Sequence, residues 1–85
     1  MARVLVAEWC SVADSERERA MARWRERSAR LSAAGCHFWV YENLASPGRF
    51  LEFTEARDTD TLVAASAQTG GSLKGDSILT EVELI

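Results

Sequence analysis

The chain has 85 residues, 47% of them hydrophobic, and a formal net charge of −3 at pH 7. It therefore predicts one domain, residues 1–85, whose small core buries about 60–65% of the unfolded chain's surface. The negative charge, with glutamates interleaved among the arginines of residues 16–30, argues against nucleic acid and anionic membranes as partners. No apolar run approaches the ~18 residues that span a bilayer, and the N-terminus does not resemble a secretory signal, so we expect a cytoplasmic protein.

The first two elements differ in their hydrophobic period. Residues 3–10, "RVLVAEWC", are rich in β-branched and aromatic residues and predict a strand. From residue 13 to residue 31 the period becomes helical, and the apolar or small residues fall on one stripe of an amphipathic helix. These residues are Ala13, Ala20, Trp24, Ser28 and Leu31.

The ends of this helix carry recognisable signals. Asp14 or Ser15 can cap its start, and Ser15 with Glu18 has the spacing of a capping box. Gly35 can adopt the left-handed conformation that ends a helix.

The remaining chain predicts a hairpin, a helix and a last strand. Strands at 36–42 and 49–56 flank "NLASPG", whose turn-forming residues and short length indicate an antiparallel hairpin. Residues 58–68 begin with capping side chains and predict a short second helix. A glycine-containing loop then leads to an alternating final strand at 78–85.

This order of elements is the βαββαβ pattern of the ferredoxin-like fold. It predicts an α+β domain, in which a four-stranded antiparallel sheet with spatial order 4-1-3-2 carries both helices on one face. Cys10 and Cys36 would then lie at opposite ends of the sheet, too far apart for the ~5.5 Å Cα separation of a disulfide. We expect two free thiols in a reducing compartment.

The two faces of the sheet depend on the register of the hairpin. A pairing of Glu42 with Arg49 would place opposite charges across the turn and fix every other position of the hairpin by alternation. The first and last strands extend the division if Leu5, Ala7 and Trp9, with Ile78, Val82 and Leu84, point to the helices. The predicted helix-facing residues are Leu5, Ala7, Trp9, Cys36, Phe38, Val40, Leu51, Phe53, Ile78, Val82 and Leu84. The predicted open-face residues are Val4, Val6, Glu8, Cys10, His37, Trp39, Tyr41, Phe50, Glu52, Thr54, Leu79, Glu81, Glu83 and Ile85. An open face this apolar needs a cover, and a second copy of the chain, giving a homodimer, is the simplest one.

Residues 33–62, "AAGCHFWVYENLASPGRFLEFTEARDTDTL", carry a family resemblance. A glycine and a small residue open the second strand, a Pro-Gly hairpin follows, an aromatic strand ends at Glu55, and the second helix has an acidic, threonine-containing start. With these features the chain resembles the dimeric α/β-barrel superfamily, most closely the antibiotic-biosynthesis monooxygenase-like domains. The resemblance implies two ferredoxin-like chains packed sheet to sheet into a barrel. It also implies a cofactor-independent oxygenase that acts on a small aromatic or polyketide-like molecule between sheet and helices.

One departure from the family concerns haem. The haem-degrading members of the superfamily use a histidine within or just after the second helix as iron ligand. The corresponding stretch here, "LVAASAQTGGSLKGDS", has no histidine, and the Asn, Trp and His set of those enzymes has no match. Haem is therefore not expected as a cofactor.

Candidate site residues lie on the two hairpin strands. His37, the only histidine, is the first candidate for a general base, although an interface or edge-strand histidine would look the same. Glu52 stands among aromatics, where partial burial could raise its pKa and suit it to proton transfer, or it could face an arginine of a second subunit. Tyr41 would assist either base. Trp39 and Phe50 could bind a flat aromatic substrate, and dimer packing explains Trp39 and Tyr41 equally well.

No cofactor is expected. Glu8, Glu81 and Glu83 could share a face with Glu52, but no histidine or aspartate stands at a ligand-like spacing, so we expect no metal. The segment "GGSLKG" lacks the phosphate-loop pattern and precedes a strand, so we expect no nucleotide.

Three functions remain open, because the fold alone does not select among them. They are a cofactor-independent monooxygenase, a non-catalytic dimeric module that binds a small molecule or supports another protein, and a cyclase or isomerase. A polar cavity lined by His37, Glu52 or Tyr41 would favour an enzyme. A sheet-helix space filled by aromatic side chains would favour the binding or structural module; these side chains are Trp9, Trp24, Phe38 and Phe53.

Overall fold

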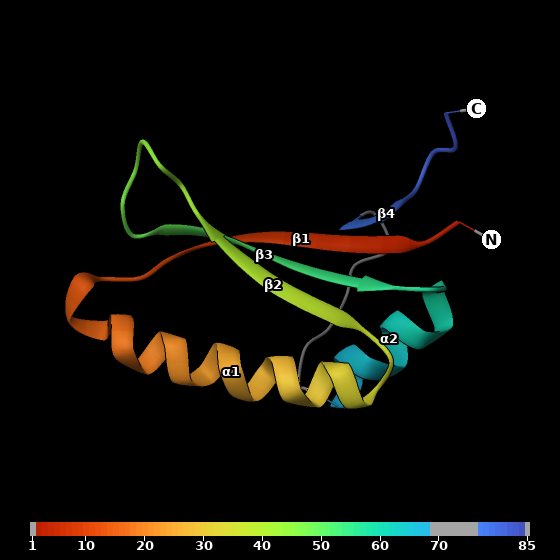
Figure 1. Cartoon of the computed structure of the whole chain (residues 1–85), viewed down its shortest axis with the longest axis horizontal. Helices are drawn as coiled ribbons and strands as arrows, with labels where there is room; N and C mark the ends of the chain where they lie inside the picture. Colours follow the sequence, from red (N-terminus) through yellow and green to blue (C-terminus); the bar gives the residue numbers. More distant parts are fainter. Residues whose placement is uncertain (1, 69–76, 85) are drawn as a thin grey trace.

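The computed structural model describes residues 2–68 and 77–84. Its elements in chain order are β1 (Val4–Ser11), a 3-10 turn (Asp14–Glu16), α1 (Arg17–Ala33), β2 (His37–Glu42), β3 (Arg49–Ala56), α2 (Thr59–Gln68) and β4 (Ile78–Thr80). The strands form one antiparallel sheet of order β2-β3-β1-β4, and both helices lie on the same face of it (Figure 1). The predicted ferredoxin-like α+β fold and its strand order are confirmed.

The start of α1 differs from the prediction. Asp14–Glu16 form a separate 3-10 turn, and α1 begins at Arg17. No side chain caps this end of the helix, so the capping box predicted from Ser15 and Glu18 does not form.

The other two helix ends follow the sequence. Gly35 has a φ of 85°, and the N–H of Cys36 donates to the carbonyl of Leu31 at 2.8 Å, which is the predicted left-handed ending of α1. At α2 the Asp58 carboxylate accepts a hydrogen bond from the N–H of Thr61 at 2.7 Å, as a capping residue does. Hydrogen bonds from the side chain and the backbone N–H of Thr61 hold the pKa of Asp58 below its ordinary value.

The register of the hairpin is one residue away from the predicted one. Glu42 pairs with Phe50 and not with Arg49. The Glu42 carboxylate instead accepts two hydrogen bonds from the Arg17 guanidinium in α1, each 2.9 Å long. The Arg49 guanidinium lies on the other face of the sheet, 4.6 Å from the centroid of the Trp9 ring. Cross-strand charge was the wrong guide to the register, because both charged groups have partners outside the hairpin.

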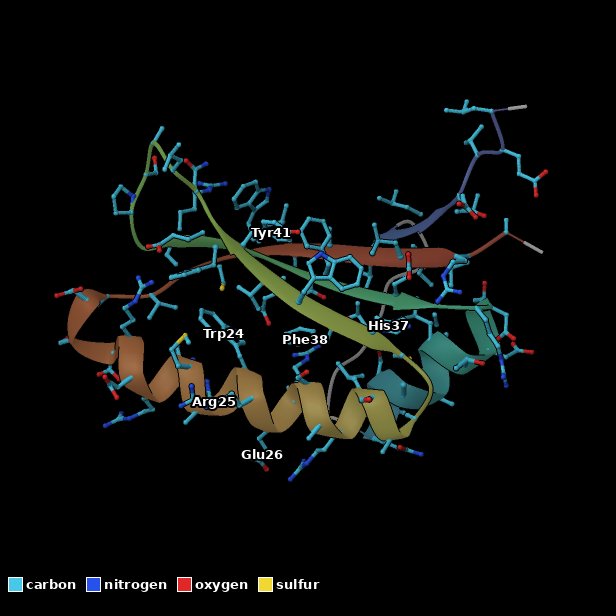
Figure 2. The ribbon with its side chains drawn as sticks, viewed as in Figure 1. Trp24, Arg25, Glu26, His37, Phe38 and Tyr41 are labelled. Atoms are coloured by element: carbon cyan, nitrogen blue, oxygen red, sulfur yellow. The ribbon has the colours of Figure 1, made fainter. Side chains whose placement is uncertain are left out.

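The shift by one residue reverses the faces predicted for β3, because neighbouring residues of a strand point to opposite faces. The faces predicted for β1, which pairs with β3, are reversed as well. The assignment of β2 is confirmed, since Phe38 faces α1 while Tyr41 lies on the far side of the sheet (Figure 2). Residues predicted for the open face that lie under the helices are Val4, Val6, Glu8, Cys10, Phe50, Glu52 and Thr54. Residues predicted for the helix side that lie on the open face are Leu5, Ala7, Trp9, Leu51 and Phe53.

The last strand is shorter than predicted. β4 ends at Thr80, so four residues predicted for this strand belong to no strand: Glu81, Val82, Glu83 and Leu84. Ile85 lies outside the described residues. Within β4, Ile78 packs on the core and Leu79 lies on the open face, both as predicted.

The buried core lies between α2, the last turns of α1 and the sheet. Its members are Val4, Val6, Leu31, Cys36, Ala56, Leu62 and Ala65. Cys10 and Cys36 are both free thiols, as predicted. Among the described residues, no helix has the length and apolar character required to span a bilayer.

Candidate ligand cavity

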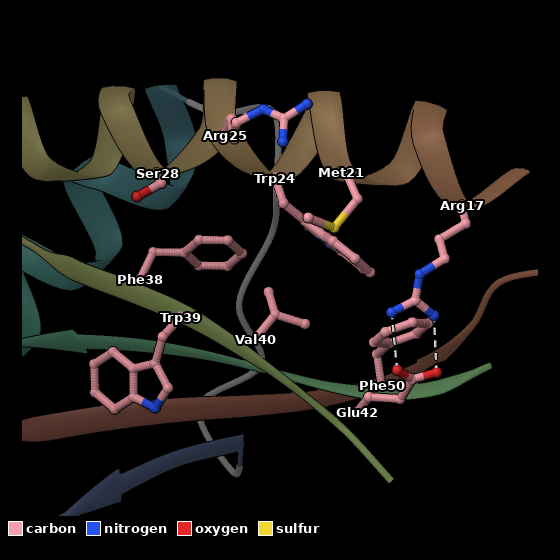
Figure 3. A pocket seen from close by; sticks show the side chains of 10 residues that line it. All are labelled: Arg17, Met21, Trp24, Arg25, Ser28, Phe38, Trp39, Val40, Glu42 and Phe50. Atoms are coloured by element: carbon pink, nitrogen blue, oxygen red, sulfur yellow. Dashed lines mark hydrogen bonds and ion pairs between the residues drawn. The ribbon is translucent and has the colours of Figure 1, made fainter. Parts of the chain in front are cut away.

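A cavity of about 310 Å³ lies between α1 and the two hairpin strands (Figure 3). Its lining residues are Arg17, Met21, Trp24, Arg25, Ser28, Phe38, Trp39, Val40, Glu42 and Phe50. The volume is at the lower end of the range for small-molecule sites, about 300–1,000 Å³.

Aromatic rings from both layers form the walls. Trp24 points from α1 toward the sheet, and its ring lies 4.8 Å from that of Phe50, with an angle of 59° between the two planes. Phe38 rises from β2 to the same space and carries the Arg27 guanidinium 5.4 Å above its ring. Such rings offer a flat ligand both stacking and edge contacts.

The position of the cavity follows from the helix stripe. Arg17, Met21, Trp24 and Ser28 recur every three or four residues, so they face the sheet together. Leu31, further along the same stripe, is completely buried in the core. One stripe of α1 therefore lines the cavity at its start and the core at its end.

An ion pair forms the polar end of the cavity (Figure 3). Both terminal nitrogens of Arg17 donate to Glu42, and the N–H of Gly48 donates to the same carboxylate at 3.0 Å. The Arg17 guanidinium also lies 5.5 Å from the centroid of the Phe50 ring. These donors lower the pKa of Glu42 to about 2, and Glu42 raises the pKa of Arg17. Glu42 is therefore ionised at neutral pH and a weak proton acceptor there.

A second cavity, of about 260 Å³, lies on the other side of this ion pair. Its lining residues are Val12, Ala13, Asp14, Arg17, Glu42, Pro47, Gly48 and Phe50. Because Arg17, Glu42 and Phe50 line both cavities, their side chains form the wall between them.

The predicted catalytic and binding residues do not come together. His37 and Tyr41 lie on the open face, away from the cavity. Trp39 contributes to the cavity wall, but its ring stacks on Phe53 at 5.6 Å on the opposite side of the sheet. Phe50 is the predicted binding residue whose ring lines the cavity.

Glu52 lies under α1 but outside the cavity. It pairs directly across the strands with Glu8 and accepts a hydrogen bond from the Cys10 thiol. Burial, followed by the contact with Glu52, raises the pKa of Cys10 to about 11. The space beside Glu52 and Arg27 is only about 10 Å³, which is room for one water at most. Glu52 is partly exposed, but it does not line the cavity beneath α1.

Sequence reasoning missed Arg17, Arg25 and Glu42 as cavity residues. The arginines of α1 were interpreted as a solvated face, and Glu42 was assigned to the hairpin register. The available signal was the position of Arg17, four and seven residues before Met21 and Trp24, which places it on their stripe. In the part of the chain that the structure describes, no three His, Cys, Asp or Glu side chains gather closely enough to hold a metal ion.

No protein-family model and no curated protein matches this sequence significantly. Solved structures do match. A Nitrosomonas europaea protein described as a candidate antibiotic biosynthesis monooxygenase superimposes with a TM-score of 0.68 at 13% identity, over 98% of this chain and 90% of that one. A Bacteroides thetaiotaomicron protein of unknown function, described as a candidate oxidoreductase, superimposes with a TM-score of 0.64 at 17% identity, over 96% of this chain and 94% of that one. A Mycobacterium tuberculosis protein superimposes with a TM-score of 0.60 at 18% identity, over 100% of this chain and 97% of that one.

At these identities the likeness is one of fold. The chain has the ferredoxin-like fold that it shares with an antibiotic-biosynthesis-monooxygenase-like protein, as the resemblance in its sequence predicted.

Proposed function

We propose that this protein binds a small planar aromatic molecule in the cavity beneath α1. The observation that carries the proposal is the composition of the walls, where Trp24, Phe38 and Phe50 converge from a helix and two strands around unfilled space. Met21 and Val40 complete an apolar surface. Sites for small ligands combine such apolar walls with a few polar groups, and the ion pair at one end supplies these.

The binding unit in this proposal is a homodimer formed through the open sheet face. Large apolar side chains are exposed on this face, including Trp9 at 51%, Tyr41 at 62% and Leu79 at 54% of their full accessible surface. Trp39 and Phe53 lie beside Tyr41. Apolar patches of this kind mark protein contacts. Two free cysteines fit a cytoplasmic location.

Cofactor-independent oxygenation is the second candidate, favoured by the description of the Nitrosomonas europaea neighbour. A methylene carbon between aromatic rings would lose two hydrogens to become a carbonyl, while O₂ supplies one atom to the carbonyl and one to water, so no external reductant is consumed. Arg17 and Arg25 could stabilise the substrate anion on this route. The roles of His37, Glu52 and Tyr41 in proton transfer stay predictions, and none of the three lines the cavity.

A thermal-shift series with 2-naphthol and anthrone tests the binding proposal, with oxygen uptake recorded on the same samples. We expect a concentration-dependent rise in melting temperature. Ser28→Leu, which fills part of the cavity, should remove the rise. Ser32→Leu, an equal change at an exposed position of the same helix, should keep it. An absence of any shift with the unmodified protein contradicts the proposal, and oxygen consumption that depends on the aromatic compound would establish the second candidate.

A further inference from the structure

The charges around the cavity point to the kind of ligand it takes. Two arginines, Arg17 and Arg25, and one glutamate, Glu42, are among its lining residues, so the lining residues are net positive although the whole chain carries a net charge of −3. Arg25 makes no hydrogen bond or ion pair within the described part of the chain. An anion inside the cavity would therefore meet an excess of positive charge.

The ion pair itself has the geometry of a carboxylate-binding site. Arg17 presents two parallel N–H groups, at 2.9 Å each, to the Glu42 carboxylate, which is the bidentate pattern by which arginine recognises carboxylates. The pair stands beside Phe50, and the Phe50 ring contacts Trp24. A ring lying along these aromatic walls would direct a carboxylate substituent to the position that Glu42 now fills.

We propose that the ligand of this cavity is an aromatic carboxylate, and that its carboxylate group pairs with Arg17 in place of Glu42. The inference rests on the proposed function, because it names the chemical class of ligand for the same cavity.

If a ligand carboxylate displaced Glu42 from Arg17, Glu42 would still have a hydrogen-bond partner. Its carboxylate also accepts the N–H of Gly48 at 3.0 Å. On the side of Gly48 lies the second cavity, of about 260 Å³, where water can solvate a carboxylate that has turned away from Arg17. The exchange thus replaces one Arg17–carboxylate pair by another, and the Arg17 and Glu42 side chains, 48% and 31% exposed, are both in reach of water.

Binding of 2-naphthoate and of its neutral analogue 2-naphthamide, measured by calorimetry on the full chain, tests the proposal. The two probes share a ring system and differ in charge. We expect 2-naphthoate to bind about tenfold more tightly than 2-naphthamide, as one charge-assisted bidentate pair allows. Arg17→Gln should lower the affinity for 2-naphthoate by about tenfold and change the affinity for 2-naphthamide by no more than about twofold. Glu42→Gln should raise the affinity for 2-naphthoate several-fold, because the competing carboxylate is gone.

Arg19→Gln is the matched control. Arg19 is an exposed residue of α1 that pairs with Glu16 at 3.2 Å and does not line the cavity, so its loss should change neither affinity. If Arg17→Gln does not fold, Arg17→Lys replaces it, since lysine keeps the charge but not the two-pronged geometry and should lose most of the preference.

The outcomes separate this inference from the function beneath it. Equal affinity for both probes overturns the choice of a carboxylate and leaves the cavity as an aromatic site. A preference that survives Arg17→Gln and disappears in Arg25→Gln overturns the assignment to Arg17. Failure of 2-naphthoate, 2-naphthamide, 2-naphthol and anthrone alike to bind removes the proposed function itself.

Discussion

The two faces of the sheet carry similar aromatic side chains in different surroundings. Under the helices, Phe38 and Phe50 oppose Trp24 and border the cavity. On the open face, Trp39 and Tyr41 both contact Phe53, with ring centroids 5.6 Å apart, and no element of the described chain covers them. An aromatic residue in this sheet therefore does not reveal its role by its type. What differs between the two faces is the layer opposite the ring, which is α1 on one side and solvent on the other.

The largest expected effect comes from a substitution on the open face and concerns dimer formation. Trp39→Glu places a charge in the contact that we propose for the dimer, where burying it without a partner is strongly unfavourable. Light scattering should show a dimer for the unmodified chain at micromolar concentration and a monomer for the variant. Val63→Glu, at an exposed site on α2, should remain dimeric. A monomeric parent protein would show that the open face has another purpose.

A change in the helix-covered face should act on folding itself. Leu31 is completely buried, and Leu31→Ala should lower the free energy of unfolding by about 3 kcal/mol through lost burial and the cavity left behind. Urea denaturation measures this loss, which should be the same at all protein concentrations. Leu44→Ala, at an exposed loop position, is the control and should have little effect. A concentration-dependent loss at Leu31 would mean that the two faces are not energetically separate.

The smallest expected effect is on the pH dependence of stability, through the Arg17–Glu42 ion pair at the edge of the helix-covered face. Arg17 and Gly48 lower the pKa of Glu42 from 4.5 to about 2 in the folded chain, so the contribution of Glu42 to stability is complete above about pH 5 and is lost as the pH falls toward 2. Glu42→Gln should therefore reduce the loss of stability over this interval, followed as the urea midpoint at each pH. Glu18→Gln, on the exposed side of α1, should reduce it less. Identical pH profiles for Glu42→Gln and the parent would contradict the assignment.

Local signals in the sequence were sufficient for the elements and their order. The helical period between residues 13 and 31, the turn-forming residues before Arg49 and the glycine after α1 each specify structure over a few residues, and the fold follows from their order. The faces of β1 were not predictable in this way. Its alternate positions are apolar on both sides, with Val4 and Val6 on one and Leu5 and Trp9 on the other. Their assignment depends on how the helices pack on the sheet, which no pattern within the strand specifies.

The cavity was also beyond the sequence pattern. It lies where the first turns of α1 face the hairpin strands, whereas α2 and the last turns of α1 pack over the core, which includes Ala56 of β3 (Figure 1). How two helices share one sheet has no local signature in the sequence. The residues that close the end of the cavity, Arg17 and Glu42, are 25 positions apart and become a pair only through the tertiary fold.

Gly48 places an evolutionary constraint on the turn beside the Arg17–Glu42 ion pair. Its φ is +91°, and a Cβ there would stand 3.0 Å from the carbonyl oxygen of Val12, so other residues are disfavoured by the backbone conformation and by the tight contact. The same residue donates the N–H that holds Glu42. Descent should therefore retain glycine at position 48 wherever this turn is kept, whether or not Arg17 and Glu42 are kept. A related chain that keeps all three residues would keep the ion pair that we propose to exchange with a ligand carboxylate.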